Sequence, residues 1–193
     1  MIINKMINYN NIVLGILQYV VINGLLNRYQ TKKLAANSCS FIHASSTVVL
    51  WSMGYINLIK YNTQGYFLFD TFNMLLTQKH SISNMALLYH HIAGTYYLSL
   101  NPEIFDWFNV AGVGELGNIP NYFVYYLLKS NPESVYLSKL KMLQKIWFGF
   151  IRIFPCSILT YYEVNEMNKA ITLIPVIPLY FLGLVWTGVI LKQ

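Results

Sequence analysis

Two adjacent histidines, His90 and His91, stand inside a mostly apolar run of the sequence. Imidazole exchanges a proton near neutral pH and serves proteins as a general base, a nucleophile or a metal ligand. Packing alone does not explain a pair of such groups in an apolar segment, so we interpret both as candidate catalytic residues. Because adjacent positions on a helix diverge by about 100°, we expect one ring to contact substrate and the other to be held by a hydrogen bond. The two residues by themselves do not name a reaction.

Further polar residues recur at intervals of three and four within other apolar runs. They are Ser40, His43, Ser46 and Thr47 in one run, Tyr66, Asp70, Asn73 and Thr77 in the next, and Glu115, Asn118 and Tyr122 in a later one. This spacing places each set on one face of a helix. Polar faces in an apolar bundle point inward, so we expect the sets to converge. The candidate supporting or substrate-binding residues are His43, Asp70, Asn73, Glu115, Asn118 and Arg152.

Each supporting residue also has a structural interpretation. Asp70 and Glu115 are typical of a polar network that fixes helix packing, or of ion-pair partners for Arg152. For His43, a structural hydrogen bond weighs as much as catalysis. A proton or ion carrier that uses the two acids and the histidines is the third and weakest functional class. The sequence contains no ligand set with the spacing of a zinc site, so we predict no metal.

The elements that would position these residues are membrane-spanning helices. Of the 193 residues, 55% are hydrophobic and 10% are charged, against about 25% charged in an ordinary soluble domain. Seven apolar runs follow one another, and the shortest, 65–76, would rise only about 18 Å as a helix. The runs cover residues 12–26, 39–58, 65–76, 85–100, 104–128, 146–161 and 171–191. The sequence therefore predicts an all-α polytopic membrane protein with about seven transmembrane helices.

The distribution of charge predicts how these helices are oriented. If all seven runs cross the membrane, the cations divide unequally between its two sides. One side carries Arg28, Lys32, Lys33, Lys79, Lys129, Lys139, Lys141, Lys145 and Lys192, and the other carries Lys5, Lys60 and Lys169. Because cytosolic loops collect lysine and arginine, this split predicts a cytosolic C-terminus and an N-terminus outside the cell or in a lumen. The net charge of +6 then reflects topology, and without a nucleic-acid-binding motif we expect no nucleic-acid partner.

Local signals add predictions for one connection and four prolines. Asn131 and Pro132 are typical of a helix start, so we expect a short surface helix within the connection 129–145. Its lysines would face anionic headgroups or a phosphate-bearing ligand, although an ordinary cation-rich loop is the simpler interpretation. Kinks are predicted at Pro120, Pro155, Pro175 and Pro178.

Four short motifs follow one another between about residue 38 and the C-terminus. They are Ser40-Phe41-Ile42-His43-Ala44, Gly65-Tyr66-Phe67-Leu68-Phe69-Asp70, Leu88-Tyr89-His90-His91-Ile92 and Gly114-Glu115-Leu116-Gly117-Asn118-Ile119-Pro120-Asn121. Their order and spacing resemble the TLC-domain family of membrane proteins, which includes ceramide synthases and TRAM translocon-associated proteins. Ceramide synthases carry further aspartates where this chain has only Glu115, so the chain is more similar to the short TLC-domain proteins. The resemblance divides the chain into an N-terminal region with the first span and a basic loop, 1–37, and a TLC domain, 38–193.

The resemblance implies a six-helix membrane bundle around a lipid-accessible cavity, preceded by one extra helix. It implies catalytic roles for His90 and His91, one as acyl acceptor or general base and the other in support. Acyl-CoA is the implied co-substrate, with no bound cofactor, in acyl transfer to a lipid amine or hydroxyl during lipid metabolism or membrane lipid homeostasis. The alternative is a non-enzymatic protein that binds, senses or escorts lipid. Membrane lipids are the implied partners, a homo-oligomer is left open, and the implied location is the endoplasmic reticulum or a related endomembrane.

Overall fold

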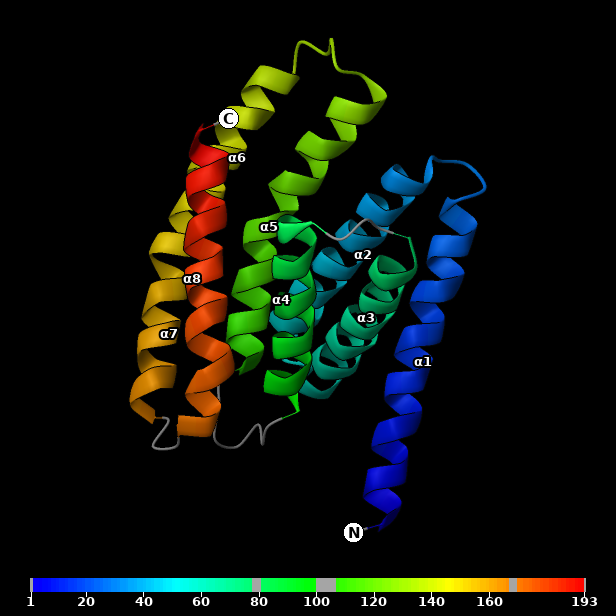
Figure 1. The fold of residues 1–193 in the computed structure, drawn as a ribbon, viewed down its shortest axis with the longest axis vertical. Helices are drawn as coiled ribbons and strands as arrows, with labels where there is room; N and C mark the ends of the chain where they lie inside the picture. The colour runs from blue at the N-terminus through cyan, green and yellow to red at the C-terminus, as the bar shows by residue number, and fades with distance from the viewer. Residues whose placement is uncertain (1, 78–80, 100–106, 167–169, 193) are drawn as a thin grey trace.

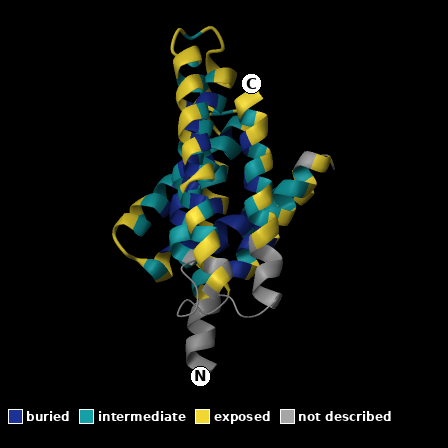
Figure 2. Cartoon of the chain, turned by 90° about the vertical axis from the view of Figure 1, so that its left-hand side faces the viewer, coloured by how far each residue is buried: buried dark blue, intermediate teal, exposed yellow. Residues whose placement is uncertain are grey.

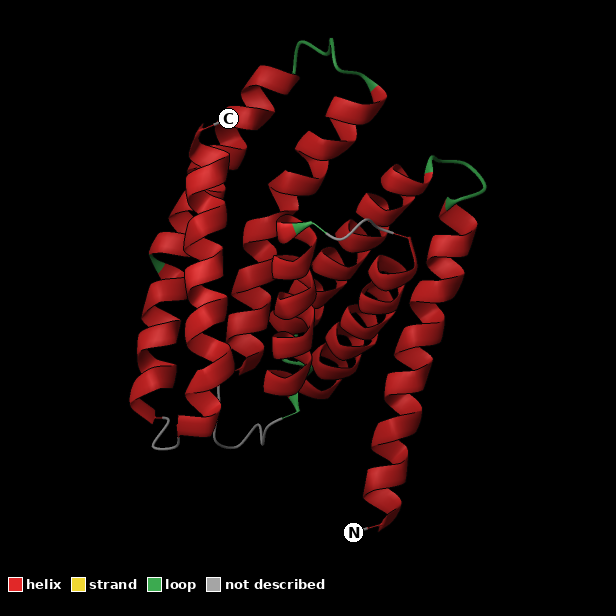
Figure 3. Cartoon of the chain, viewed as in Figure 1, coloured by secondary structure: helices red, strands yellow, loops and turns green. Residues whose placement is uncertain are grey.

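The computed structural model describes residues 2–77, 81–99, 107–166 and 170–192. Within these residues the chain forms α1 (Ile2–Leu26), α2 (Lys32–Ser52), α3 (Ile56–Thr77), α4 (Ile82–Leu98), α5 (Trp107–Ser130), α6 (Leu137–Ile153), α7 (Pro155–Glu166) and α8 (Ala170–Lys192). No strand occurs in the described ranges, and the all-α class is confirmed (Figure 3).

Each predicted apolar run corresponds to one helix except the second and the sixth, which each contain parts of two. The sixth run, 146–161, divides into α6 and α7 at Phe154. The kink predicted at Pro155 is therefore present, because proline lacks the N–H that would continue the helix. The short run 65–76 lies within the 22-residue α3, which is about 33 Å long. Its length was underestimated because polar residues that precede the run are helical and buried.

Two local predictions are wrong. The run 39–58 is not one helix, because α2 ends at Ser52 and α3 begins at Ile56. Between them Gly54 has a φ of 72°, a left-handed conformation that glycine adopts without steric cost. The short surface helix expected within 129–145 is also absent from the structure. Instead α5 continues to Ser130 and includes Lys129, while Lys139, Lys141 and Lys145 lie on the first turns of α6. Helices α5 and α8 run through Pro120, Pro175 and Pro178 without a break.

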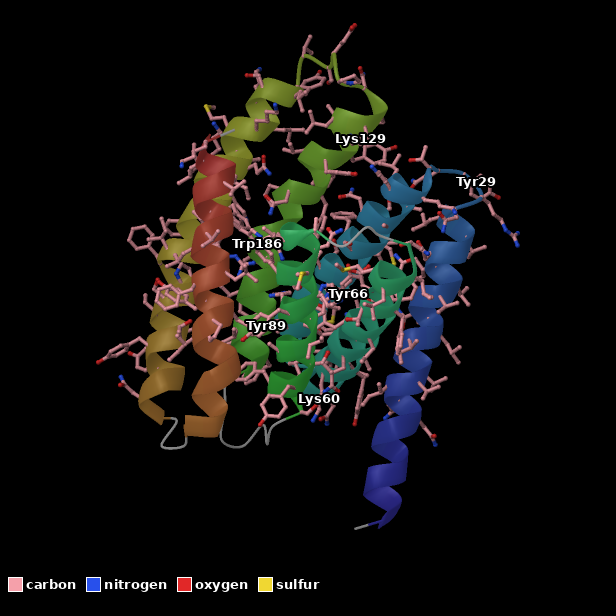
Figure 4. The ribbon with its side chains drawn as sticks, viewed as in Figure 1. Tyr29, Lys60, Tyr66, Tyr89, Lys129 and Trp186 are labelled. Carbon is pink, nitrogen blue, oxygen red and sulfur yellow. The ribbon has the colours of Figure 1, made fainter. Side chains whose placement is uncertain are left out.

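The helices run alternately up and down in one bundle, with α6 and α7 forming a single transit (Figure 1). The α1–α2 and α5–α6 connections and the end of α8 lie at the upper end in this view. We call it the basic end, because its described cations include Arg28, Lys129 and Lys192, whereas Lys60 lies toward the opposite end (Figure 4). The predicted separation of the cations is found for these residues. Lys79 and Lys169 lie outside the described residues, and nothing is described of the Lys5 side chain.

The outside of the bundle is rich in large apolar side chains, and polar side chains are buried among apolar ones in its middle, where the buried residues gather (Figure 2). On α1, Leu14 and Val21 are 62% and 59% exposed, and on α8 Val185 is 62% exposed. The buried polar residues are His43, Thr47, Asn62, Thr63, Gln64, His91, Glu115, Gln144 and Thr187. Apolar exposure on this scale is rare in a soluble domain.

One helical segment of the described chain, Leu137–Tyr162, is long and apolar enough to cross a membrane. It is the α6–α7 transit. Asn10–Leu26 and Ile177–Lys192 are shorter apolar helical stretches within α1 and α8.

Helix α1 contacts α3 backbone to backbone. A Cβ atom built on Gly65 would lie 2.7 Å from the Cα atom of Gly15, so no larger residue fits there without displacing a helix. This close approach allows Tyr19, one turn further along α1, to reach the centre of the bundle, where it is fully buried. The helix that precedes the TLC-like motifs therefore contributes to the polar interior.

Candidate functional site

The polar interior is centred on His43 of α2, which is fully buried. Its Nε2 atom lies 3.3 Å from Oε1 of Glu115 on α5. Its ring stacks on that of Tyr66 on α3, with ring centroids 4.1 Å apart. Because protein atoms enclose it on these sides, His43 has the environment of a residue that joins three helices, which agrees with its structural interpretation.

Two residues complete this network that the sequence analysis did not select, Tyr19 and Asn62. The Tyr19 hydroxyl donates a hydrogen bond of 2.6 Å to Oδ1 of Asn62. The Asn62 amide in turn donates to Ser46 and Thr47 on α2, each at 3.0 Å. A signal for Asn62 was present, because it precedes Tyr66 by four residues on the same helical face. Tyr19 has no such signal, since it stands alone among the apolar residues of α1.

A second chain of hydrogen bonds joins Glu115 to Arg152 through Asn118. The Asn118 amide donates to Oε2 of Glu115 at 3.1 Å, and Nη2 of Arg152 donates to Oδ1 of Asn118 at 3.0 Å. Arg152 also donates to the carbonyl oxygen of Gly114 at 3.3 Å. The ion pair considered between Glu115 and Arg152 is therefore replaced by an amide that bridges the two charges.

The two adjacent histidines have different surroundings, as expected from their divergence around α4. His91 is buried and stacks on the ring of Phe67, with ring centroids 4.9 Å apart. Its Nδ1 atom lies 3.6 Å from Oδ2 of Asp70. The His90 side chain points away from His91, and the centroid of its ring lies 5.6 Å from that of the Trp186 ring on α8.

At Nδ1, neither ring makes the hydrogen bond expected to hold one of them. Both Nδ1 atoms are buried without a hydrogen-bond partner among the described residues. The Asp70 carboxylate is the nearest charge to His91, but 3.6 Å exceeds hydrogen-bond length. Ring stacking on Phe67 holds His91 instead. That stacking depends on Gly94, because a Cβ atom there would lie 2.6 Å from the Phe67 ring.

A cavity of about 120 Å³ lies between α4, α5, α7 and α8. His90, Glu115, Asn118 and Arg152 line one end of it, and Leu98 and Val110 line the other. Four of the eight predicted site residues thus share one cavity, and its described charged side chains gather at one end.

The other four predicted residues do not line this cavity. His43 lies behind Glu115, and His91 and Asp70 face one another beside Phe67. Asn73 is half-buried on α3, one turn beyond Asp70, and the structure does not bring it to the cavity. Within the described residues, no three histidine, cysteine or acidic side chains are placed to share a metal ion.

Comparison with protein-family models, with curated proteins and with solved structures finds no match to this chain. The function is therefore inferred from the site itself and from the motifs of the sequence.

Proposed function

We propose that this chain is a polytopic membrane protein that crosses the bilayer seven times, with α6 and α7 as one span. Its polarity supports this proposal, since large apolar side chains cover much of the outside and polar side chains, His43 and Glu115 among them, are buried inside. A hydrocarbon solvent favours that arrangement. The cations of the basic end support a cytosolic C-terminus. The resemblance to the TLC-domain family supports an endomembrane, such as the endoplasmic reticulum, as the location.

The function that we propose is acyl transfer to a membrane lipid. The observation that carries it is the position of His90 at one end of a mostly apolar cavity inside the bundle, beside Glu115 and Arg152. An apolar cavity suits an acyl chain, and an imidazole at its end suits attack on an acyl carbonyl. The TLC-like motif around His90 and His91 supports the same chemistry.

In the proposed reaction, a ring nitrogen of His90 attacks the carbonyl carbon of an acyl-CoA thioester. The carbon–sulfur bond breaks, and the proton on the other ring nitrogen passes to the CoA thiolate. A lipid amine or hydroxyl then attacks the acyl carbon, the acyl–nitrogen bond breaks, and the proton of the acceptor returns to the ring. His91 and Asp70 support the fold around the reacting ring. Lys139, Lys141 and Lys145 at the basic end are suited to the phosphates of CoA.

An acyl-transfer assay tests this assignment. Purified wild-type protein is incubated with radiolabelled acyl-CoA and mixed lipid acceptors, together with His90→Ala, His91→Ala and Ile92→Ala. Ile92 is the control, because it follows on the same helix but is 57% exposed to the outside of the bundle. We expect the His90 variant to lose transfer, the His91 variant to be impaired and the Ile92 variant to match wild type. Equal transfer by all four proteins would show that the catalytic assignment is wrong.

A second function, lipid binding without turnover, is favoured by one specific observation. Catalytic imidazoles are usually oriented by a hydrogen bond to the ring nitrogen that does not react. Neither His90 nor His91 has such a bond at Nδ1. This alternative predicts that lipid co-purifies with the protein while no acyl product and no acyl adduct on His90 is found by mass spectrometry.

A further inference from the structure

The cavity contains a cation for which the protein supplies no anionic partner. Within the described part of the chain, no carboxylate lies within ion-pair distance of the Arg152 guanidinium. Glu115 is engaged by His43 and Asn118 instead. The Nε atom of Arg152 is fully buried and makes no hydrogen bond. A buried charged donor without a partner is costly, so this site is suited to an anion.

Three glycines surround the guanidinium and leave room beside it. Cβ atoms built on Gly114 of α5 and Gly183 of α8 would lie 3.8 and 3.7 Å from Nη1 of Arg152. A Cβ atom on Gly117 of α5 would lie 3.9 Å from Nε. Any longer side chain at these positions would occupy the space next to the charged group. The two helices thus expose the guanidinium to the cavity.

The rest of the cavity wall is mostly apolar and leads away from the basic end. From His90 to Leu98, α4 advances about 12 Å along the cavity. Phe67, Val110 and Leu179 line the same stretch. The cavity is narrow, with a volume of about 120 Å³, so it accommodates part of one acyl chain and not two chains side by side.

We propose that this cavity binds the head and first carbons of a long-chain fatty acid, with the carboxylate on the Nη1 side of the Arg152 guanidinium and the chain directed toward Leu98. The proposal rests on the lipid-handling function above and names the ligand of that site. A carboxylate fits better than a phosphate, because Arg152 lies about 22 Å along the helix from the start of α6. At that depth a carboxylate with one negative charge is easier to desolvate than a phosphate monoester with nearly two.

The placement of Arg152 also relates the fatty acid to the proposed chemistry. Arg152 and His90 line the same end of the cavity, so a carboxylate on Arg152 lies at the end where the acyl carbon would react. The free acid is then a competitor of the acyl donor. It is also the product if water replaces the lipid acceptor.

The test compares ligands that share a chain and differ in charge at the head. Delipidated full-length protein in detergent is titrated with radiolabelled palmitic acid, in competition with hexadecanol and with methyl palmitate. We expect the acid to bind at least tenfold more tightly than either neutral ligand. Arg152→Gln should lower the affinity for the acid by about tenfold to a hundredfold, the loss typical of a hydrogen bond to a charged group. It should leave binding of hexadecanol unchanged.

Arg28→Gln is the matched control, because it makes the same substitution at an exposed arginine of the basic end, outside the cavity. It should bind the acid as the wild type does. The comparison of acid with alcohol uses the wild type alone and decides the question even if Arg152→Gln does not fold. Equal affinity of the wild type for acid, alcohol and ester would overturn the proposal, as would unchanged acid binding by a folded Arg152→Gln.

These outcomes are distinct from those of the transfer assay. Acid-selective binding without acyl transfer would refute the proposed catalysis and leave the fatty-acid site standing. Acyl transfer together with equal binding of acid and ester would refute the fatty-acid site and leave the catalysis standing.

Discussion

Replacing Gly65 by alanine tests whether α1 is a structural part of the bundle. The new Cβ atom would lie 2.6 Å from the backbone carbonyl carbon of Gly15 and 2.7 Å from its Cα atom. Both contacts are with backbone, which cannot rotate away as a side chain can. Helix α1 must therefore move outward, and Tyr19 then withdraws from Asn62.

The magnitude follows from three contributions. Overpacking typically costs about 1 to 3 kcal/mol. A buried acceptor on Asn62 that loses its partner costs about 1 to 3 kcal/mol more. Alanine gains about 1 kcal/mol over glycine in helix propensity, which offsets part of this loss. We expect Gly65→Ala to lower the free energy of unfolding by roughly 3 kcal/mol net, within a range of about 1 to 5 kcal/mol.

Gly24 provides the control, because a Cβ atom there meets nothing within 4 Å. Gly24→Ala should therefore gain up to about 1 kcal/mol from helix propensity alone. The assay is unfolding of the protein in mild-detergent micelles by added sodium dodecyl sulfate, followed by circular dichroism at a helical wavelength. The two substitutions should shift the midpoint in opposite directions. Equal midpoints for Gly65→Ala and Gly24→Ala would refute the close packing of α1 on α3.

Two further predictions concern the interior and the orientation. Tyr19→Phe removes the donor of the 2.6 Å bond to Asn62 and should lower the free energy of unfolding by about 1 to 3 kcal/mol. Tyr29→Phe, at a residue that is 86% exposed, should change it little, and equal effects would contradict the buried network. For orientation, Val135→Cys and Met53→Cys are placed in a variant without the two native cysteines and treated with a membrane-impermeant thiol reagent. In sealed vesicles with the cytosolic face outward, only the Val135 variant should react, and labelling of both would contradict the proposed topology.

Much of the fold could be predicted because its signals are local. An apolar run with polar residues at intervals of three and four defines a helix and its inward face without reference to other helices. The placement of His43 and Glu115 on inward faces followed from this spacing. Helix ends were less predictable, since Ser52 and Ile56 are separated by a turn that depends on one glycine with positive φ. The extent of α3 was missed because its first turns are polar yet buried.

The site was predicted as a set of residues and not as an arrangement. Which histidine faces the cavity depends on how α4 is rotated against α3 and α8, and sequence spacing does not determine that rotation. His90 lines the cavity because Phe67 occupies the space over Gly94 and stacks on His91. In the same way, only the packing of α5 on α6 places Asn118 between Glu115 and Arg152.

By itself, the sequence determined that the chain is helical, where its apolar runs lie and which of their faces are polar. It also determined that most of the cations lie in alternate connections between these runs. These properties arise from residues close together in the chain. The tertiary structure alone decided that Tyr19 of α1 reaches the buried polar network and that Arg152 has no carboxylate partner among the described residues. Both depend on contacts between distant helices, and a close approach such as that of Gly15 and Gly65 leaves no periodic signal in the sequence.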